Sequence, residues 1–175
     1  MDLREKKTRR SIYNAFLKIR ATKPLEKITI KELAEEAEIS KATFYLHYKD
    51  VYDLSDALQA EAISKIIENI EDPESMTENP ERVFVSLSNS FQANQGLVDI
   101  LFSSSQKSKL PLLVEQAIIE KVFAVHPEYK DDLAITTKLS FMIMGCFYAY
   151  LNNRNSYNDT IVIETISDSL KKLSL

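Results

Sequence analysis

The residues with the most evident chemistry lie close together in residues 39–50, which read ISKATFYLHYKD. Aromatic, basic and apolar side chains follow one another here, and their order does not divide obviously into buried and exposed positions. If a short helix begins after a serine cap at Ser40, the helical period places Phe44 and Tyr48 on one face, which we expect to point inward. Leu46 then lies on the opposite arc, where it has no core to enter. The other side chains on this arc or its flanks are Ala42, Thr43, Tyr45, His47 and Lys49.

An outer face of this composition suits contact with duplex DNA. Lys41 at the start of the helix can donate to guanine O6 and N7, and Ala42 and Leu46 can contact thymine methyl groups. The side chains that would reach phosphate oxygens are Thr43, Tyr45, His47 and Lys49. The alternative is that a neighbouring helix buries Leu46 and that Tyr45 is ordinary surface.

Two earlier helices are expected to position this segment. The sequence from Thr29 to Glu32 predicts a capping box, in which the threonine hydroxyl and the glutamate carboxylate satisfy the first free amides of a helix. The first helix carries an apolar stripe and ends before Pro24; its stripe is Ile12, Ala15, Phe16 and Ile19. In the second helix Leu33, Ala34 and Ala37 face inward. A break at residues 38–39 then separates the second helix from the third, which is the outline of a helix-turn-helix.

Charge is divided unevenly along the chain. Residues 1–49 hold 12 Lys or Arg against 7 Asp or Glu, whereas residues 50–175 hold 10 against 19, and the whole chain has a formal charge of −4. A basic first quarter suits a domain that meets phosphates. A chance basic excess on a solvated helix is the alternative interpretation.

The run from residue 28 to residue 54, ITIKELAEEAEISKATFYLHYKDVYDL, resembles the DNA-binding domain of the TetR family of transcriptional regulators. The residues that fit the family pattern are Thr29, Ala34, Ala37, Ser40, Phe44, Tyr45, His47 and Leu54. The resemblance implies DNA contacts by Thr29, Ser40, Lys41, Ala42, Thr43, Tyr45, Leu46, His47 and Lys49. Of these, Lys41, Ala42, Tyr45 and Leu46 would lie nearest the bases.

Two positions depart from the family pattern. Glu38 stands where the family has a turn glycine, and a left-handed conformation there would cost about 1 kcal/mol. Val51 replaces a lysine at the start of the next helix, so one phosphate contact is missing, and the salt dependence of binding falls by about one charge.

The fold class is predicted to be all-α, because the chain has only 2 Gly and 5 Pro and its apolar residues recur at helical spacing. We expect a helix-turn-helix domain at residues 1–49 and a helical dimerisation and regulatory domain at residues 50–175. Asp50 caps a helix that runs to about residue 70, and residues 72–78 form a loop. Later helices are predicted to start at residues 79–81 and close at Gly96, to cover residues 112–125, and to start at residues 131–132.

The last two helices are more apolar than one small domain needs, which predicts a homodimer built as a four-helix bundle. The predicted interface residues are Phe147, Tyr150, Ile163, Ile166, Leu170 and Leu173. A two-fold dimer would ask for a palindromic operator. The alternative is that both helices complete an intramolecular core.

The resemblance also implies an effector held among the middle helices, for which the candidate lining residues are Phe84, Phe91, Phe123, Met142 and Phe147. A stripe of aromatic and methionine residues at helical spacing is also typical of a plain core. With 175 residues the chain is short for the family, and it most resembles the branch related to regulators of dihydroxyacetone kinase operons. Some members of that branch respond to a protein partner.

Enzyme function is not expected. Two glycines cannot form a phosphate-binding loop, the two histidines are far apart in the sequence, and the single Cys146 fits a buried helix. No cofactor and no metal site are predicted. The apolar run at residues 141–151 is short for a bilayer and the N-terminal residues lack an apolar signal region, so we expect a cytoplasmic protein without a membrane segment.

Two hypotheses follow. The first is a sequence-specific repressor that an effector or a protein partner releases from its operator. The second is a co-activator or interaction protein that uses the same scaffold with weak or no DNA binding. Glu38 and Val51 favour the second, and the intact segment from Ser40 to Lys49 favours the first.

Overall fold

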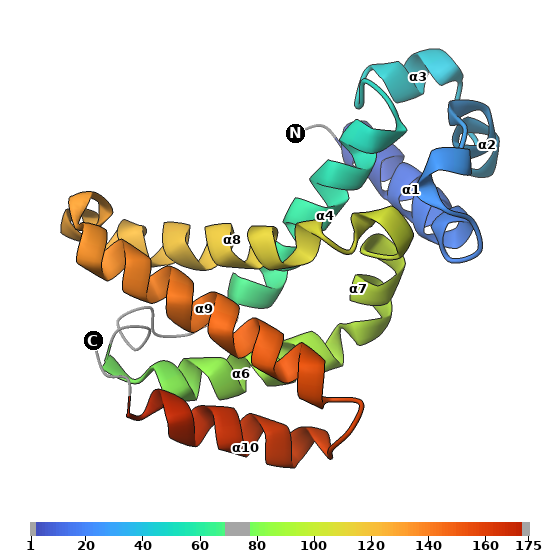
Figure 1. The fold of residues 1–175 in the computed structure, drawn as a ribbon. Helices are drawn as coiled ribbons and strands as arrows, with labels where there is room; N and C mark the ends of the chain where they lie inside the picture. Colours follow the sequence, from blue (N-terminus) through green and yellow to red (C-terminus); the bar gives the residue numbers. More distant parts are fainter. Residues whose placement is uncertain (1–2, 69–77, 173–175) are drawn as a thin grey trace. The chain divides into compact units, whose positions relative to one another are not determined.

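The computed structural model describes residues 3–68 and 78–172. Within these ranges the chain forms helices joined by turns and contains no strand, which confirms the all-α prediction (Figure 1). Most of the predicted loop at residues 72–78 and the predicted interface residue Leu173 lie outside the described residues.

The chain divides into two compact units. Unit 1 comprises Met1–Ala62 and Gly96–Ser108, and unit 2 comprises Ile63–Gln95 and Lys109–Leu175. Unit 1 is therefore larger than the domain of residues 1–49 expected from the sequence. It gains the first part of the fourth helix and a segment that follows some thirty residues later in the chain.

The helices of unit 1 are α1 (Leu3–Arg20), α2 (Ile30–Glu36), α3 (Lys41–Tyr45), the first part of α4 (Val51–Glu68) and most of α7 (Gln95–Leu101). Short 3-10 helices cover Leu25–Lys27 and Ser104–Gln106. Most of the predicted inward residues are buried, among them Ile12 and Phe16 of α1 and Leu33 of α2, whereas Ile19 is half-buried. An ion pair at 2.6 Å between Lys18 and Glu36 joins the surfaces of α1 and α2.

Unit 2 contains the end of α4, α6 (Pro80–Ala93), α8 (Lys109–Val125), α9 (Leu133–Asn153) and α10 (Asp159–Leu170). The predicted start of α9 is confirmed, because Asp132 accepts hydrogen bonds from the main-chain N–H groups of Ala134 and Ile135. Lys121 of α8 donates to the carbonyl of Ile67 at 2.9 Å, which places a cation at the negative end of α4.

Helix α10 packs against α6 and α9 (Figure 1). The core between them is formed by Met142, Val162, Ile166 and Leu170. Phe84, Cys146 and Tyr150 pack on its edge. The apolar stripe of α10 is therefore used inside the chain.

The prediction that Gly96 closes α6 is wrong. Helix α6 ends at Ala93 with Asn94 as its C-cap, and Gly96 lies within α7 without a positive φ. Asn94 ends the helix partly by donating its side-chain amide to the carbonyl of Ser90 at 2.8 Å. Asn79 occupies the predicted N-cap position, with Pro80 in the first turn, but its side chain makes no capping hydrogen bond.

Candidate nucleic-acid interface

Helix α3 is defined by a serine cap. The side chain of Ser40 accepts a hydrogen bond from the N–H of Thr43 at 3.0 Å, and the Ser40 main chain is extended, as an N-cap requires. The helix ends at Tyr45, although the N–H of Tyr48 still donates to the carbonyl of Phe44 at 3.0 Å. The segment from Ser40 to Tyr48 therefore keeps the helical register that the sequence predicted.

Two aromatic rings hold α3 on the rest of unit 1. Phe44 is 0% exposed and Tyr48 is buried, and their ring centroids lie 5.9 Å apart. Tyr45 meets the edge of Phe44 with an interplanar angle of 85°, while remaining 57% exposed itself. The predicted inner face of the segment is confirmed.

The outer face of α3 is open to solvent. Leu46 is 83% exposed, so the alternative that a neighbouring helix buries it does not hold within the described part of the chain. Lys41, Ala42 and Lys49 are also exposed, and Thr43 and His47 are half-buried. Exposure of so large an apolar side chain beside cations and hydroxyl groups is what contact with base edges would use.

The turn that precedes α3 ends α2 in a Schellman motif. The N–H of Ile39 donates to the carbonyl of Ala34 at 2.9 Å, and the N–H of Glu38 donates to that of Glu35 at 3.2 Å. Glu38 adopts φ 55°, the left-handed conformation that a glycine would take without strain. The expected strain at this position is present.

The capping box of α2 is also present. Thr29 Oγ1 accepts from the N–H of Glu32, and the Glu32 carboxylate accepts from the Thr29 N–H at 3.0 Å. The Glu32 carboxylate also accepts a hydrogen bond from Lys23 Nζ at 2.5 Å. Hydrogen bonds from Lys23 and then Thr29 lower the pKa of Glu32 to about 2. Thr29 is exposed, as a DNA contact requires, although its hydroxyl already has a local partner.

Tyr52, in the first turn of α4, is a candidate contact that the sequence analysis did not identify. Asp50 caps the helix by accepting from the N–H groups of Tyr52 and Asp53, each at 2.8 Å. Val51 is buried and offers no charge to a phosphate, whereas Tyr52 is about half exposed with a phenol group that can donate. Helical periodicity from the buried Val51 and Leu54 could have placed Tyr52 outside.

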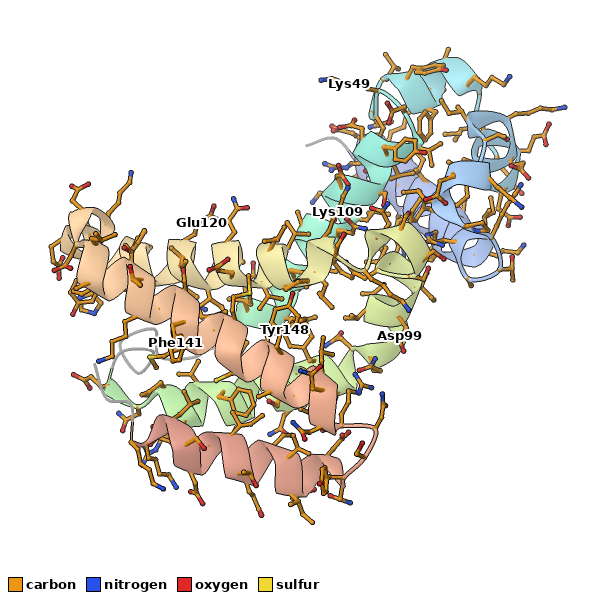
Figure 2. The ribbon with its side chains drawn as sticks, viewed as in Figure 1. Lys49, Asp99, Lys109, Glu120, Phe141 and Tyr148 are labelled. Carbon is orange, nitrogen blue, oxygen red and sulfur yellow. The ribbon has the colours of Figure 1, made fainter. Side chains whose placement is uncertain are left out.

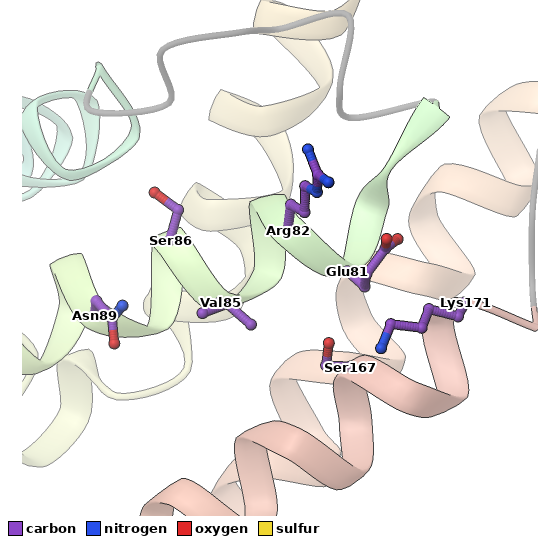
Figure 3. A pocket seen from close by; sticks show the side chains of 7 residues that line it. All are labelled: Glu81, Arg82, Val85, Ser86, Asn89, Ser167 and Lys171. Atoms are coloured by element: carbon purple, nitrogen blue, oxygen red, sulfur yellow. The ribbon is translucent and has the colours of Figure 1, made fainter.

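The predicted effector residues are all at least partly buried in unit 2. Met142 lies in the core beneath α10, Phe84 packs against that core, and Phe91, Phe123 and Phe147 are half-buried. An open groove of about 620 Å³ lies elsewhere in unit 2, between α6 and α10 (Figure 3). The residues that line it are mostly of polar or charged type: Glu81, Arg82, Val85, Ser86, Asn89, Ser167 and Lys171.

Three predicted interface residues are already covered. Ile163, Ile166 and Leu170 are each less than 10% exposed within the single chain, because α10 turns them towards α6 and α9. Within the single chain they lie in an intramolecular core, as the alternative interpretation expects. Tyr150 and Phe147 are half-buried on α9, and Arg154 lies over the Tyr150 ring at 5.5 Å.

Helix α9 instead exposes a different apolar face. Phe141 is 67% exposed and Tyr148 is 50% exposed (Figure 2), with Gly145 between them on the same side. By length and composition α9 could cross a membrane, since its most apolar window has a mean hydropathy of 1.3 and is 11% buried. The prediction based on residues 141–151 alone underestimated this helix.

Groups that could hold a metal are missing from the described ranges, where no cluster of three or more His, Cys, Asp or Glu side chains occurs. Burial raises the pKa of the Cys146 thiol to about 11, which leaves it protonated and a poor nucleophile. Among the described residues, the surface around α3 is the candidate site that combines an exposed apolar side chain with cations and hydroxyl groups on a capped helix.

No family model matches the chain, and no curated protein matches it. The resemblance of residues 28–54 to the TetR family stays a prediction that rests on the motif.

Proposed function

We propose that this protein is a sequence-specific transcriptional regulator that binds double-stranded DNA through α3. The observation that carries the proposal is the pairing of a fully buried Phe44 with an 83% exposed Leu46 two residues later on one short, capped helix. A single exposed leucine is ordinary on a protein surface, so Leu46 supports the proposal through its neighbours: the lysines, hydroxyl groups and histidine around it form a mixture suited to base edges and phosphates.

The division of labour on α3 follows from the chemistry of the major groove. Lys41 would donate to guanine, and Ala42 and Leu46 would contact thymine methyl groups. The phosphate contacts would come from Thr43, Tyr45, His47 and Lys49, with Thr29 and Ser40 beside them. Tyr52 in the first turn of α4 is a further phosphate donor, which offsets in part the lysine that Val51 replaces.

A homodimer is part of the proposal. The exposed face of α9 around Phe141 and Tyr148 is better suited to a second copy than the α10 stripe, because only the former is free of its own chain. Two copies related by a two-fold axis would present two α3 helices to the two halves of a palindromic operator. We further propose that the protein works in the cytoplasm as a repressor and that an effector or partner bound to unit 2 releases it.

The test is DNA binding measured by fluorescence anisotropy at several salt concentrations. The duplexes are the region upstream of the protein's own gene, the best sequence from a random-duplex selection, and scrambled versions of both. We expect the wild type to prefer a specific duplex by about a thousandfold or more. Lys41→Ala and Tyr45→Ala should each remove about tenfold to a hundredfold of that preference.

Matched controls come from unit 2. Tyr157→Ala removes an equally exposed tyrosine and Lys130→Ala removes an exposed lysine, and neither should change the preference. Equal loss in the controls and in the α3 variants would show an effect that is not specific to α3 and would contradict the assignment of α3.

A second candidate function is protein binding on the same scaffold. It is favoured by the buried Val51 and by the exposed carboxylate of Glu38 at the turn before α3, which would repel phosphates. If the wild type binds every duplex equally weakly, including those from the random selection, this candidate replaces the first.

A further inference from the structure

A buried polar network in unit 1 has no part in the proposed DNA contacts. Arg20, at the end of α1, is only 3% exposed, and its guanidinium donates to the carbonyls of Lys23 at 3.0 Å and Ser103 at 2.9 Å. Gln59 of α4 is fully buried and donates through Nε2 to the carbonyl of Leu101 at 2.9 Å. Side chains of α1 and α4 thus hold two carbonyls at the end of α7.

A third contact lies nearby. Ser105 donates its hydroxyl to the carboxylate of Glu26, in the 3-10 helix that follows α1. This hydrogen bond is the largest cause of a lowered Glu26 pKa, and the Arg20 charge lowers it further. Side chains of α1, α4 and the 3-10 helix after α1 therefore form hydrogen bonds with residues 101–105.

Residues 96–108, which contain these contacts, have an unusual place in the chain. Residues 96–108 belong to unit 1, but the helices directly before and after them, α6 and α8, belong to unit 2. A displacement of either helix acts on this segment through the main chain. The main chain therefore connects the two units at both ends of this segment, in addition to the connection within α4.

The contact between residues 96–108 and the rest of unit 1 buries polar atoms that lack hydrogen-bond partners as well as apolar side chains. Val98, Leu101 and Phe102 are buried in unit 1, yet Arg20 Nε, Gln59 Oε1 and Ser55 Oγ are buried without a hydrogen-bond partner in the described part of the chain. Ser104 has φ 54°, a left-handed conformation that costs a non-glycine residue free energy. Opening would expose these atoms to solvent and relax Ser104, and both effects favour the open state.

We propose that residues 96–108 are a latch on the DNA-binding unit, which opens as one piece when α6 or α8 is displaced. Closed, it fixes α1 and α4 in the arrangement that supports α2 and α3, and this is the form that binds DNA. The second statement rests on the proposed function, whereas opening as one piece is a property of the chain alone. Reciprocity then requires that DNA binding favours the closed latch.

Hydrogen–deuterium exchange of the full chain without DNA tests the opening. Arg20→Lys keeps the charge but loses the two-armed geometry that reaches both carbonyls. We expect amides of residues 98–108 to exchange about tenfold faster, as loss of one charge-assisted hydrogen bond would allow, while those of α2 and α3 change less than about twofold. The N–H of Phe102, which donates to the carbonyl of Val98, is a reporter inside the segment.

Ser104→Gly gives the opposite change and does not remove a contact of Arg20. Glycine adopts positive φ freely, so exchange of the same amides should slow severalfold. The matched control is Arg10→Lys, the same substitution at an exposed position of α1, which should leave the exchange pattern unchanged. Equal acceleration of α2, α3 and residues 98–108 in Arg20→Lys would overturn the latch, as would no change in both variants.

Operator affinity tests the second statement. With the duplex obtained by selection, Arg20→Lys should weaken binding about tenfold, Ser104→Gly should bind at least as tightly as wild type, and Arg10→Lys should stay within about twofold. If Arg20→Lys opens the segment but binds DNA normally, the regulatory role is wrong although DNA binding stands. If the wild type binds no DNA, the proposed function and the regulatory role both fail, while the exchange data still decide whether the segment opens.

Discussion

Two helices of this protein, α3 and α9, expose large apolar side chains, and they do so in different surroundings. On α3, Leu46 stands beside lysines, hydroxyl groups and a histidine, on a helix whose inner face is locked by Phe44 and Tyr48. On α9, Phe141 and Tyr148 stand on a helix that is itself mostly apolar.

The difference indicates different partners. An isolated leucine among polar and basic groups fits a surface that is itself mixed, as the floor of the major groove is, with thymine methyl groups between donors and acceptors. A continuous apolar face has no such polar pairing to offer and fits another apolar face, from a second copy of the chain. Exposure alone therefore says little until the neighbouring side chains are considered.

The largest expected effect separates the two faces of α3. Phe44→Ala should lower the free energy of unfolding by about 3–5 kcal/mol, because it leaves a cavity under the helix. Leu46→Ala should change it by less than about 0.5 kcal/mol and yet weaken operator binding. Urea unfolding followed by circular dichroism measures the first, and anisotropy measures the second. Comparable stability losses in both variants would mean that Leu46 is packed.

The next effect concerns the apolar face of α9. Phe141→Glu should raise the dissociation constant of the dimer by about a hundredfold or more, since each copy would bury a carboxylate without a partner. Light scattering across a concentration series measures this change. Leu112→Glu, at an exposed leucine of α8, is the control and should leave the dimer intact.

Two outcomes would break the comparison. A wild type that is monomeric at micromolar concentration would leave the α9 face without its proposed partner. Sedimentation of the wild type with lipid vesicles, abolished by Phe141→Glu, would assign that face to a membrane, which the length and composition of α9 allow.

The smallest effect sharpens the account of how α2 supports α3. The bonds from Lys23 and Thr29 lower the Glu32 pKa from 4.5 to about 2, so the folded state is stabilised by the carboxylate above about pH 4.5. That contribution is lost as the pH falls from about 4.5 through about 2. The melting temperature of the wild type should exceed that of Glu32→Gln near neutral pH, and the difference should vanish at the acid end. The group is at the surface, so the difference is small.

Glu35→Gln is the control for that experiment. Its carboxylate lies on the same helix, exposed, with a lysine only at 3.8 Å. Its melting profile should follow that of the wild type. A pH-independent difference between wild type and Glu32→Gln would contradict the assignment to the carboxylate.

Much of unit 1 could be predicted because its signals are local. A serine three residues before a free amide, a threonine paired with a glutamate, and an aspartate before α4 each act within one helical turn, and all three are present as hydrogen bonds. The inward position of Phe44 and the exposure of Leu46 follow from the helical period once the cap fixes its phase.

Positions that depend on distant segments are harder to predict. The spacing of Ile163, Ile166 and Leu170 describes an apolar stripe equally well whether a second copy or α6 covers it. Gly96 looked like a helix end because glycine often is one, yet Asn94 ends α6 two residues earlier through its own side chain. No local pattern tells which surface covers the α10 stripe, whereas the Asn94 cap is a local signal that the nearby glycine obscured.

The sequence by itself determined that the chain is all-α, where most helices of unit 1 begin, and which face of α3 looks outward, because caps and periodicity act between residues a few positions apart. Only the tertiary structure decided that α10 serves the chain's own core, that Phe141 and Tyr148 are left uncovered, and that residues 96–108 join unit 1 through Arg20 and Gln59. These outcomes depend on which surfaces meet across long stretches of chain, and burial against a remote segment leaves no periodic signal of its partner in the sequence.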